Sequence, residues 1–158
     1  MKWNTTMQMY QDEGIAWRKA WGWKRNEARL YAGLVKGTSL HVCAGAAELG
    51  DVKLDLTHPW TDVKADAMKL PFRDNMFDTC ICDPPWLHGV ELRILKELRR
   101  VTKHRIIFIT MNKIWFPSKS NWTLTDMYVL LKVGHSQHNI KGCYVFDNNA
   151  NQSLEEYQ

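Results

Sequence analysis

The sequence predicts an α/β fold in which most strands of one sheet run parallel. The run 104–110 is almost continuously apolar, which is typical of a central strand covered on both faces. Three shorter strands are expected at 39–43, 51–55 and 77–82, and each ends at or leads into an acid or a turn of small residues. In nucleoside-binding α/β folds the carboxyl ends of parallel strands carry the ligand-binding groups, so we expect a site at that edge.

Composition predicts a single compact domain over residues 1–158. Hydrophobic residues make up 45% of the chain and charged residues 24%, which suits one globular core. No run approaches the roughly 20 apolar residues that span a bilayer. The first six residues lack the apolar stretch of a secretory signal, so we expect a cytoplasmic protein without membrane contact. The net charge of +4 permits binding to nucleic acid.

The cysteines and tryptophans indicate buried thiols and some aromatic surface. None of the four cysteines forms a Cys-x-x-Cys pair, and three lie in apolar runs, so we expect free thiols and neither a disulfide framework nor a metal site. Eight tryptophans exceed what so small a core can hide. Some are therefore expected to be exposed or to lie at an interface.

A helix is expected over residues 11–35, because apolar and aromatic residues recur there at three- and four-residue spacing. Gly37 follows at a plausible helix end. A neighbouring stripe carries Arg18, Arg25 and Arg29. Two interpretations stay open: a helix packed on the core with a solvated basic edge, or a basic rail that faces phosphates beside an aromatic patch.

The segment 38–67 has the features of a nucleoside site. The strand 39–43 runs into the small-residue turn 44–50, which lets the backbone approach a ligand closely. The strand 51–55 ends in Asp55, where an acid can accept hydrogen bonds from ribose hydroxyls. A short strand, 62–65, then ends at Asp66 and Ala67.

The first two crossovers of this segment are too short for ordinary helices. Parallel strands usually need a crossover of about a dozen residues or more, whereas here the gaps are 44–50 and 56–61. We therefore expect abridged crossover helices. The N-terminal helix could cover part of the sheet face that they leave open, and a partner subunit the rest.

The motif Asp83-Pro84-Pro85-Trp86 directly follows the strand 77–82. Proline fixes φ and donates no backbone hydrogen bond, so the strand must stop and the loop is stiff. The Asp83 carboxylate and the Pro84 carbonyl could accept hydrogen bonds from one amino group, while the Trp86 indole stacks on a flat ring. The motif therefore predicts a site for an exocyclic amine on a planar substrate.

The rest of the chain is expected to complete the sheet. A helix over 90–101 carries a basic stripe that is either a solvated face or a nucleic-acid contact; the stripe is Arg93, Lys96, Arg100 and Lys103. A short turn or helix is expected at 123–127, an antiparallel pair at 127–133 and 141–147, and a frayed polar tail at 148–158. The core is thus expected over 38–147.

Taken in order, these landmarks resemble a class I S-adenosylmethionine-dependent methyltransferase over roughly residues 38–110. The final motif resembles that of the amino-methyltransferases, which modify exocyclic nitrogens, mainly N6 of adenine and N4 of cytosine. In that family the form that begins with Asp favours adenine, and the Trp form also occurs in RNA adenosine methyltransferases. The resemblance implies a Rossmann-like methyltransferase sheet, mostly parallel with a closing antiparallel strand, and S-adenosyl-L-methionine as cofactor.

On the cofactor side, the resemblance implies a turn under the methionine part, an acid at the ribose, and an acid with a backbone N–H at the adenine. The residues with these roles would be Cys43, Ala44 and Gly45 for the turn, Asp55 for the ribose, Asp66 and Ala67 for the adenine, and Asp83 beside them.

On the target side, the resemblance implies that Asp83 and the Pro84 carbonyl hold the amino group, that Pro85 completes the motif and that Trp86 stacks on the base. Further substrate contacts are expected from His88, Lys113 and Trp115. The implied partner is DNA or RNA. Little chain remains for a separate recognition domain, so a homodimer or a partner subunit could supply target recognition.

Two other functions stay open. The chain could be a catalytically weak or inactive cofactor- or nucleic-acid-binding subunit of a methyltransferase complex. It could also methylate a protein amide, although that branch usually begins the motif with Asn, whereas this chain has Asp83.

Overall fold

Ten elements make up the structure, a computed structural model that describes residues 8–11, 23, 25–85, 89–111, 120–133 and 138–150. The helices are α1 (Arg25–Leu34) and α2 (Val90–Val101). The strands are β1 (Gln8–Gln11), β2 (Ser39–Val42), β3 (Val52–Asp55), β4 (Val63–Lys64), β5 (Phe77–Cys82), β6 (Thr102–Thr110), β7 (Trp122–Val133) and β8 (His138–Asn148).

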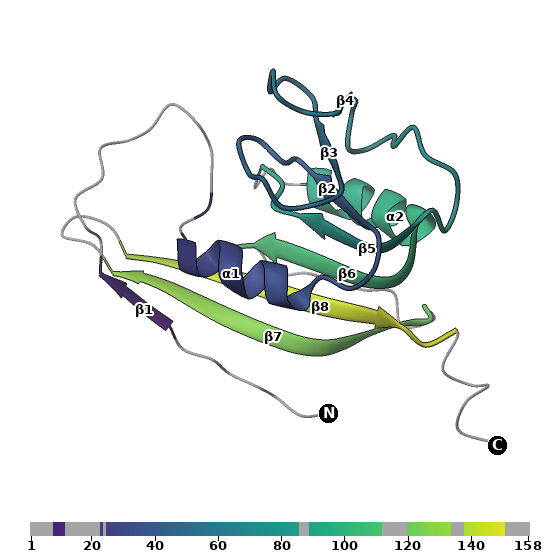
Figure 1. Ribbon diagram of the computed structural model, residues 1–158. Coiled ribbons are helices and arrows are strands. Elements are labelled where there is room, and N and C mark those ends of the chain that lie inside the picture. The colour runs from purple at the N-terminus through teal and green to yellow at the C-terminus, as the bar shows by residue number, and fades with distance from the viewer. Residues whose placement is uncertain are drawn as a thin grey trace.

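All eight strands form one sheet in the order β1-β7-β8-β6-β5-β2-β3-β4 (Figure 1). The strands β4, β3, β2, β5 and β6 pair in parallel, and β8 runs antiparallel between β6 and β7. The predicted α/β fold, a mostly parallel sheet with an antiparallel closing strand, is confirmed. The parallel pairing of β1 with β7 was not expected from the sequence.

The two helices cover opposite faces of the sheet. Along β5, Cys80 and Cys82 belong to the cluster that α2 closes with Ile94 and Leu98, while Ile81 belongs to the cluster around Tyr31 of α1. Successive side chains of a strand point to opposite faces, so each central strand contributes to both clusters. This double coverage explains the continuous apolar run of β6.

The predicted short crossovers are confirmed. The connections 43–51 and 56–62 contain neither helix nor strand. They can join parallel strands because β2 and β3 are each only four residues long, so the chain needs to return only about 13 Å. Aspartates fasten both connections: Asp51 Oδ2 accepts from the Ser39 backbone N–H at 2.8 Å, and Asp62 Oδ2 from that of Lys53 at 2.8 Å.

The helix expected over 11–35 is wrong in its bounds. Gln11 lies in β1, Trp23 lies outside any helix, and α1 spans only Arg25–Leu34. Residues 12–22 and 24, including Arg18 of the predicted basic stripe, lie outside the described residues. The contacts of Trp23 with the sheet, described below, override the helical periodicity.

Two further expectations near the C-terminal end are corrected. The turn or helix expected at 123–127 is part of β7, where β-branched and aromatic residues pair with β8. The strand β8 extends through Asn148, so the polar tail begins later than predicted. The bounds predicted for β5 and α2, by contrast, match the structure.

Two residues of the predicted basic stripe have structural partners, and one of them, Lys103, lies in β6 and not in α2. Arg100 donates to the carbonyls of Leu70 and Phe72 at 2.9 and 2.7 Å and pairs with Glu97, which pins the preceding loop to the helix. Lys103 pairs with Asp78 at 3.3 Å. The exposed members, Arg93 and Lys96, are those that remain for a solvent or nucleic-acid role.

The C-terminal strand is tied to the centre of the sheet by a charge pair. Arg105 on β6 donates two hydrogen bonds of 2.7 Å to the carboxylate of Asp147 on β8, and one of 3.2 Å to the Leu34 carbonyl at the end of α1. The bidentate contact fixes β8 against β6, and the hydrogen bond to Leu34 fixes the end of α1 there. Within the described chain, no helix is long and apolar enough to cross a membrane.

Candidate active site

The turn after β2 has the backbone of a close-approach loop. Cys43 and Gly45 have φ angles of +57° and +53°, in the left-handed region that favours glycine. Two hydrogen bonds hold this turn: the Ala44 N–H donates to the Leu54 carbonyl, and the Gly45 N–H to the Asp55 carboxylate, both at 3.0 Å. The strained Cys43 is therefore fixed by the neighbouring strand.

Asp55, at the end of β3, organises the loops around it. Its Oδ2 accepts from the Gly45 N–H, and its Oδ1 accepts from the N–H groups of Thr57 and His58 at 3.0 Å each. Partial burial acts to raise the pKa of Asp55, but the three backbone donors outweigh it and lower the pKa. The side chain is therefore a carboxylate at neutral pH, and Oδ2 keeps a lone pair for a ligand hydroxyl.

Asp83, directly after β5, is 3% exposed. Its Oδ2 accepts from the Trp23 indole at 2.8 Å and from the Lys141 ammonium at 2.9 Å. Its Oδ1 is buried and has no hydrogen-bond partner among the described residues. Burial raises the pKa of Asp83, and the charge of Lys141 and the Trp23 hydrogen bond act against that rise. A buried acceptor of this kind could take a hydrogen bond from a donor on a ligand.

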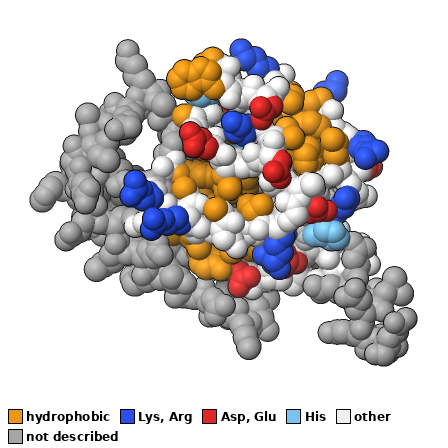
Figure 2. All heavy atoms as spheres, in the orientation of Figure 1, with side chains coloured by type: hydrophobic (Ala, Val, Ile, Leu, Met, Phe, Trp, Pro, Cys, Tyr) orange, Lys and Arg blue, Asp and Glu red, His pale blue; other side chains and the backbone are white. Residues whose placement is uncertain are grey.

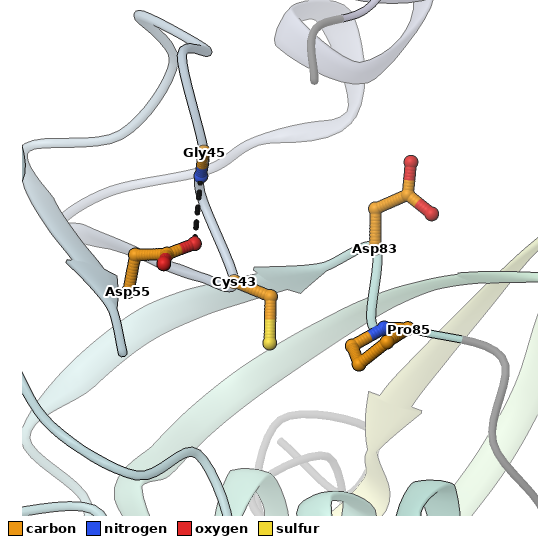
Figure 3. Close-up of a pocket in the computed structure, with 5 residues that line it drawn as sticks. All are labelled: Cys43, Gly45, Asp55, Asp83 and Pro85. Carbon is orange, nitrogen blue, oxygen red and sulfur yellow. Dashed lines mark hydrogen bonds between the residues drawn. The ribbon is translucent and has the colours of Figure 1, made fainter. Parts of the chain in front are cut away.

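These two acids line one pocket of about 190 Å³ (Figure 3). The lining residues described are Cys43, Gly45, Asp55, Asp83 and Pro85. They come from the carboxyl ends of β2, β3 and β5, and Cys43 lies between the two acids in Figure 3. The pocket thus lies at the sheet edge where α/β folds bind ligands.

The other predicted site residues are either described but absent from the pocket lining, or outside the described chain. Ala44 and Pro84 are buried, and the residues on either side of each in the sequence line the pocket. Asp66 is exposed in the loop after β4, where its Oδ1 accepts from the Met68 N–H at 2.8 Å, and Ala67 is buried. Four predicted substrate contacts fall outside the described residues, namely Trp86, His88, Lys113 and Trp115.

Sequence reasoning missed three residues at Asp83: Trp23, Lys141 and Glu27, whose carboxylate lies 3.3 Å from the Lys141 ammonium. Trp23 and Glu27 are four residues apart, which is the spacing of two residues on the same face of a helix. No pattern in the sequence links Lys141 to Asp83, because their contact joins positions 58 residues apart.

His41 and Tyr31 hold the Trp23 indole in place. The His41 ring stacks on it with centroids 4.6 Å apart, and Tyr31 meets it edge-on at 4.6 Å. His41 is 1% exposed and its Nδ1 lies 2.9 Å from the Leu49 carbonyl. Burial lowers the pKa of His41 to about 4, so the imidazole is neutral at pH 7 and Nδ1 must carry the proton that Leu49 accepts.

A family model described as a methyltransferase domain matches residues 28–110, just over half of the chain. The chain belongs to this methyltransferase-domain family. The match begins in α1 and extends through β6, and it includes every described residue that lines the pocket. A comparison with curated proteins finds no match.

Solved structures share the fold of this methyltransferase domain at low sequence identity. An S-adenosylmethionine-dependent methyltransferase from Thermotoga maritima, described as a possible histamine N-methyltransferase, aligns with a TM-score of 0.56 and 12% identity, over 77% of this chain and 87% of its own. A structure from work on the conversion of a disulfide bond into a thioacetal in echinomycin biosynthesis aligns with a TM-score of 0.55 and 17% identity, over 79% of this chain and 82% of its own. A Pyrococcus horikoshii protein aligns with a TM-score of 0.53 and 16% identity, over 78% of this chain and 87% of its own.

The cofactor of this methyltransferase is S-adenosylmethionine, as its family implies. The pocket has groups that suit it. Asp55 has a free lone pair for a ribose hydroxyl, and Gly45 presents backbone without a side chain. When bound, the cofactor supplies an electrophilic methyl group; the residues of this chain must hold the group that receives it.

Proposed function

We propose that this methyltransferase acts on the exocyclic amino group of a nucleic-acid base, with N6 of adenine as the first candidate. The observation that supports this most is Asp83 Oδ1, a buried carboxylate oxygen that has no partner among the described residues and belongs to a residue lining the pocket. The neighbouring Pro84 carbonyl offers a second acceptor, because proline leaves no N–H beside it. Two acceptors suit an NH2 group.

The chemistry is mainly positioning. The lone pair of an aromatic amine is delocalised into the ring, so the amine is a poor nucleophile. Two acceptors on its hydrogens favour a tetrahedral nitrogen and aim the lone pair at the methyl carbon. The bound cofactor would supply the methyl group and leave as a thioether, and solvent could take the extra proton from the methylated amine. Asp83 would therefore need to accept a hydrogen bond but not to act as a strong base.

Nucleic acid is the proposed partner, and α1 gives it a basic surface. Arg25 and Arg29 are exposed on this helix, whose Glu27 reaches the Asp83 site. Figure 2 shows basic side chains in the region where α1 begins in Figure 1. We propose single-stranded DNA or RNA as the first substrate, because it avoids the cost of flipping a base out of a duplex.

The test is transfer of a labelled methyl group to a panel of single-stranded DNA, single-stranded RNA, duplexes and proteins, followed by analysis of the modified nucleosides. We expect N6-methyladenine from the wild type and at least about 100-fold less from Asp83→Asn, since misplacing a reacting group costs about that much. Asp74→Asn, an exposed acid near Arg100, is the matched control and should retain activity. Label only in protein would contradict the nucleic-acid assignment.

A competing candidate is a subunit that binds the cofactor without transferring its methyl group. The Lys141–Asp83 contact favours it, since the ion pair already occupies Asp83 Oδ2. A partner subunit, or a second copy of the chain, would then supply catalysis or target recognition. Saturable binding of the cofactor with no label on any substrate would support this candidate.

A further inference from the structure

A chain of three polar side chains holds the acceptor Asp83 from the α1 side of the sheet. The Lys141 ammonium lies 2.9 Å from Asp83 Oδ2 and 3.3 Å from a Glu27 oxygen. The Trp23 indole N–H donates to the same Oδ2 at 2.8 Å. Lys141 comes from β8, Glu27 from α1 and Trp23 from just before α1. Lys141 and Trp23 contact Oδ2 directly, whereas Glu27 contacts Lys141.

This cluster is shielded from water. The side chains of Lys141, Glu27 and Asp83 are 16%, 15% and 2% exposed. Charges in such a place interact more strongly than on a surface, because little solvent screens them. An unpaired carboxylate there would be costly, so Lys141 is the group that makes an ionised Asp83 tolerable.

The arrangement also fixes the direction of the carboxylate. Both donors lie on Oδ2, so rotation of the carboxyl group would break two hydrogen bonds. Trp23 is itself immobilised by the stacked His41 ring and the edge of Tyr31. A donor held on several sides is a rigid one, and both donors leave Oδ1 as the buried oxygen that has no partner among the described residues.

We propose that Lys141 and Trp23 are positioning residues that hold Asp83 as a carboxylate with Oδ1 presented to the target amine. This inference rests on the proposed role of Asp83 as the acceptor of that amine. Glu27 orients Lys141 through its own carboxylate, and its negative charge opposes the ionisation of Asp83.

The groups that face Asp83 have distinct effects on its charge. Lys141 of β8 favours the carboxylate and Glu27 of α1 disfavours it. Cys143 of β8 and Cys82 of β5 lie close enough to interact, but burial raises the pKa of both thiols, so they are neutral at pH 7. Replacing Lys141 and replacing Glu27 should therefore move the titration of Asp83 in opposite directions.

The first experiment follows the Asp83 carboxyl carbon by NMR as a function of pH, in the full chain without substrate. Lys141→Met should move its midpoint to higher pH. Trp23→Phe, which keeps a ring against His41 and Tyr31 but loses the N–H, should move it the same way. Glu27→Gln, which keeps the shape and a hydrogen-bond acceptor, should move it to lower pH. Lys103→Met, which breaks a surface ion pair, is the control and should not move it.

The second experiment measures methyl transfer. Lys141→Met should lower kcat by about 10- to 100-fold at pH 7 with the KM for the cofactor unchanged, and should shift the acidic limb of the pH profile upward. Lys141→Arg, which restores a cation, should recover part of the loss. A merely structural role for Lys141 would lower stability without moving the limb.

The inference is overturned if Lys141→Met leaves the Asp83 midpoint in place, or if Glu27→Gln moves it in the same direction as Lys141→Met. If Lys141→Met does not fold, the near-isosteric Glu27→Gln and Trp23→Phe variants decide. The NMR titration needs no substrate. A wild-type chain that transfers no methyl group would therefore refute the proposed function, while the titration still tests the positioning.

Discussion

At the scale of single residues, the carboxylate of Asp55 has two roles. It closes the turn after β2 through the Gly45 N–H, and it lines the pocket with a lone pair to spare. Asp83 has the opposite character: burial raises its pKa, whereas backbone donors lower that of Asp55 despite partial burial. One acid is thus built to stay charged and the other is charged only with the help of its neighbours.

This contrast leads to a prediction for Asp55→Asn. Loss of a charged acceptor should weaken cofactor binding by about 1–3 kcal/mol, measured by titration calorimetry. Asp51→Asn is the control, because Asp51 also accepts from backbone and side chain at Ser39 but does not belong to the described pocket lining. Equal affinity for wild type and Asp55→Asn would reject the ribose role.

The pH dependence of stability has a definite sign at Asp55. Its folded-state pKa is lowered, so its contribution to the free energy of unfolding is fully present above the unfolded-state pKa of about 3.9 and is lost as pH falls through the folded value. As the pH falls, the free energy of unfolding of the wild type should therefore lose the contribution of Asp55, whereas that of Asp55→Asn has no such contribution to lose.

At the scale of elements, two glycines, one in α1 and one just after it, have opposite requirements. Gly33 lies in the helix, and an added Cβ would meet nothing within 4 Å. Gly37 follows the helix with φ +62°, and an added Cβ would lie 2.7 Å from the Asp78 Cβ. The same substitution should therefore stabilise one position and destabilise the other.

We expect Gly33→Ala to raise the free energy of unfolding by about 0.5–1 kcal/mol, since alanine is the better helix former. Gly37→Ala should lower it by at least about 1–2 kcal/mol, because a left-handed residue with a Cβ is strained and Asp78 must move away from Thr38. Urea unfolding of both variants measures this. Equal effects of the two substitutions would contradict the turn geometry at Gly37.

At the scale of the whole molecule, protection from water is uneven. The strands β5 and β6 lie in the middle of the strand order with buried side chains on both faces, whereas β4 is a two-residue strand at the edge. Beyond β3 the connecting loop exposes Leu56 and Trp60, which are 65% and 77% exposed, in line with the expectation that some tryptophans reach the surface.

Native-state hydrogen exchange should follow this order. Amides of β5 and β6 should exchange with an opening free energy near that of global unfolding, and those of β4 with one close to zero. Because no crossover helix covers β3 and β4, this end of the sheet should open without the rest. Equal protection of β4 and β5 would show that another surface covers the edge.

How much the sequence could predict depends on the range of the interactions. The bounds of β5 and α2 follow from local signals, namely an apolar run stopped by prolines and a helical stripe, and the short crossovers follow from counting residues. The start of α1 could not be predicted, because Trp23 leaves the helix to reach Asp83. Lys141 could not be predicted either, since only the antiparallel register of β8 brings it to the site.

That antiparallel register also sets an order of assembly. Since β8 runs against its neighbours, its first residues lie at the edge where the parallel strands end, and Lys141 is among them. A ribosome synthesises Asp55 and Asp83 well before Lys141, and β8 must then insert between β6 and β7, strands that are already made. Until it does, Asp83 lacks its counter-charge. Asp83 is therefore synthesised before the residue that supplies its counter-charge, and we expect their contact to form only once β8 has inserted between β6 and β7.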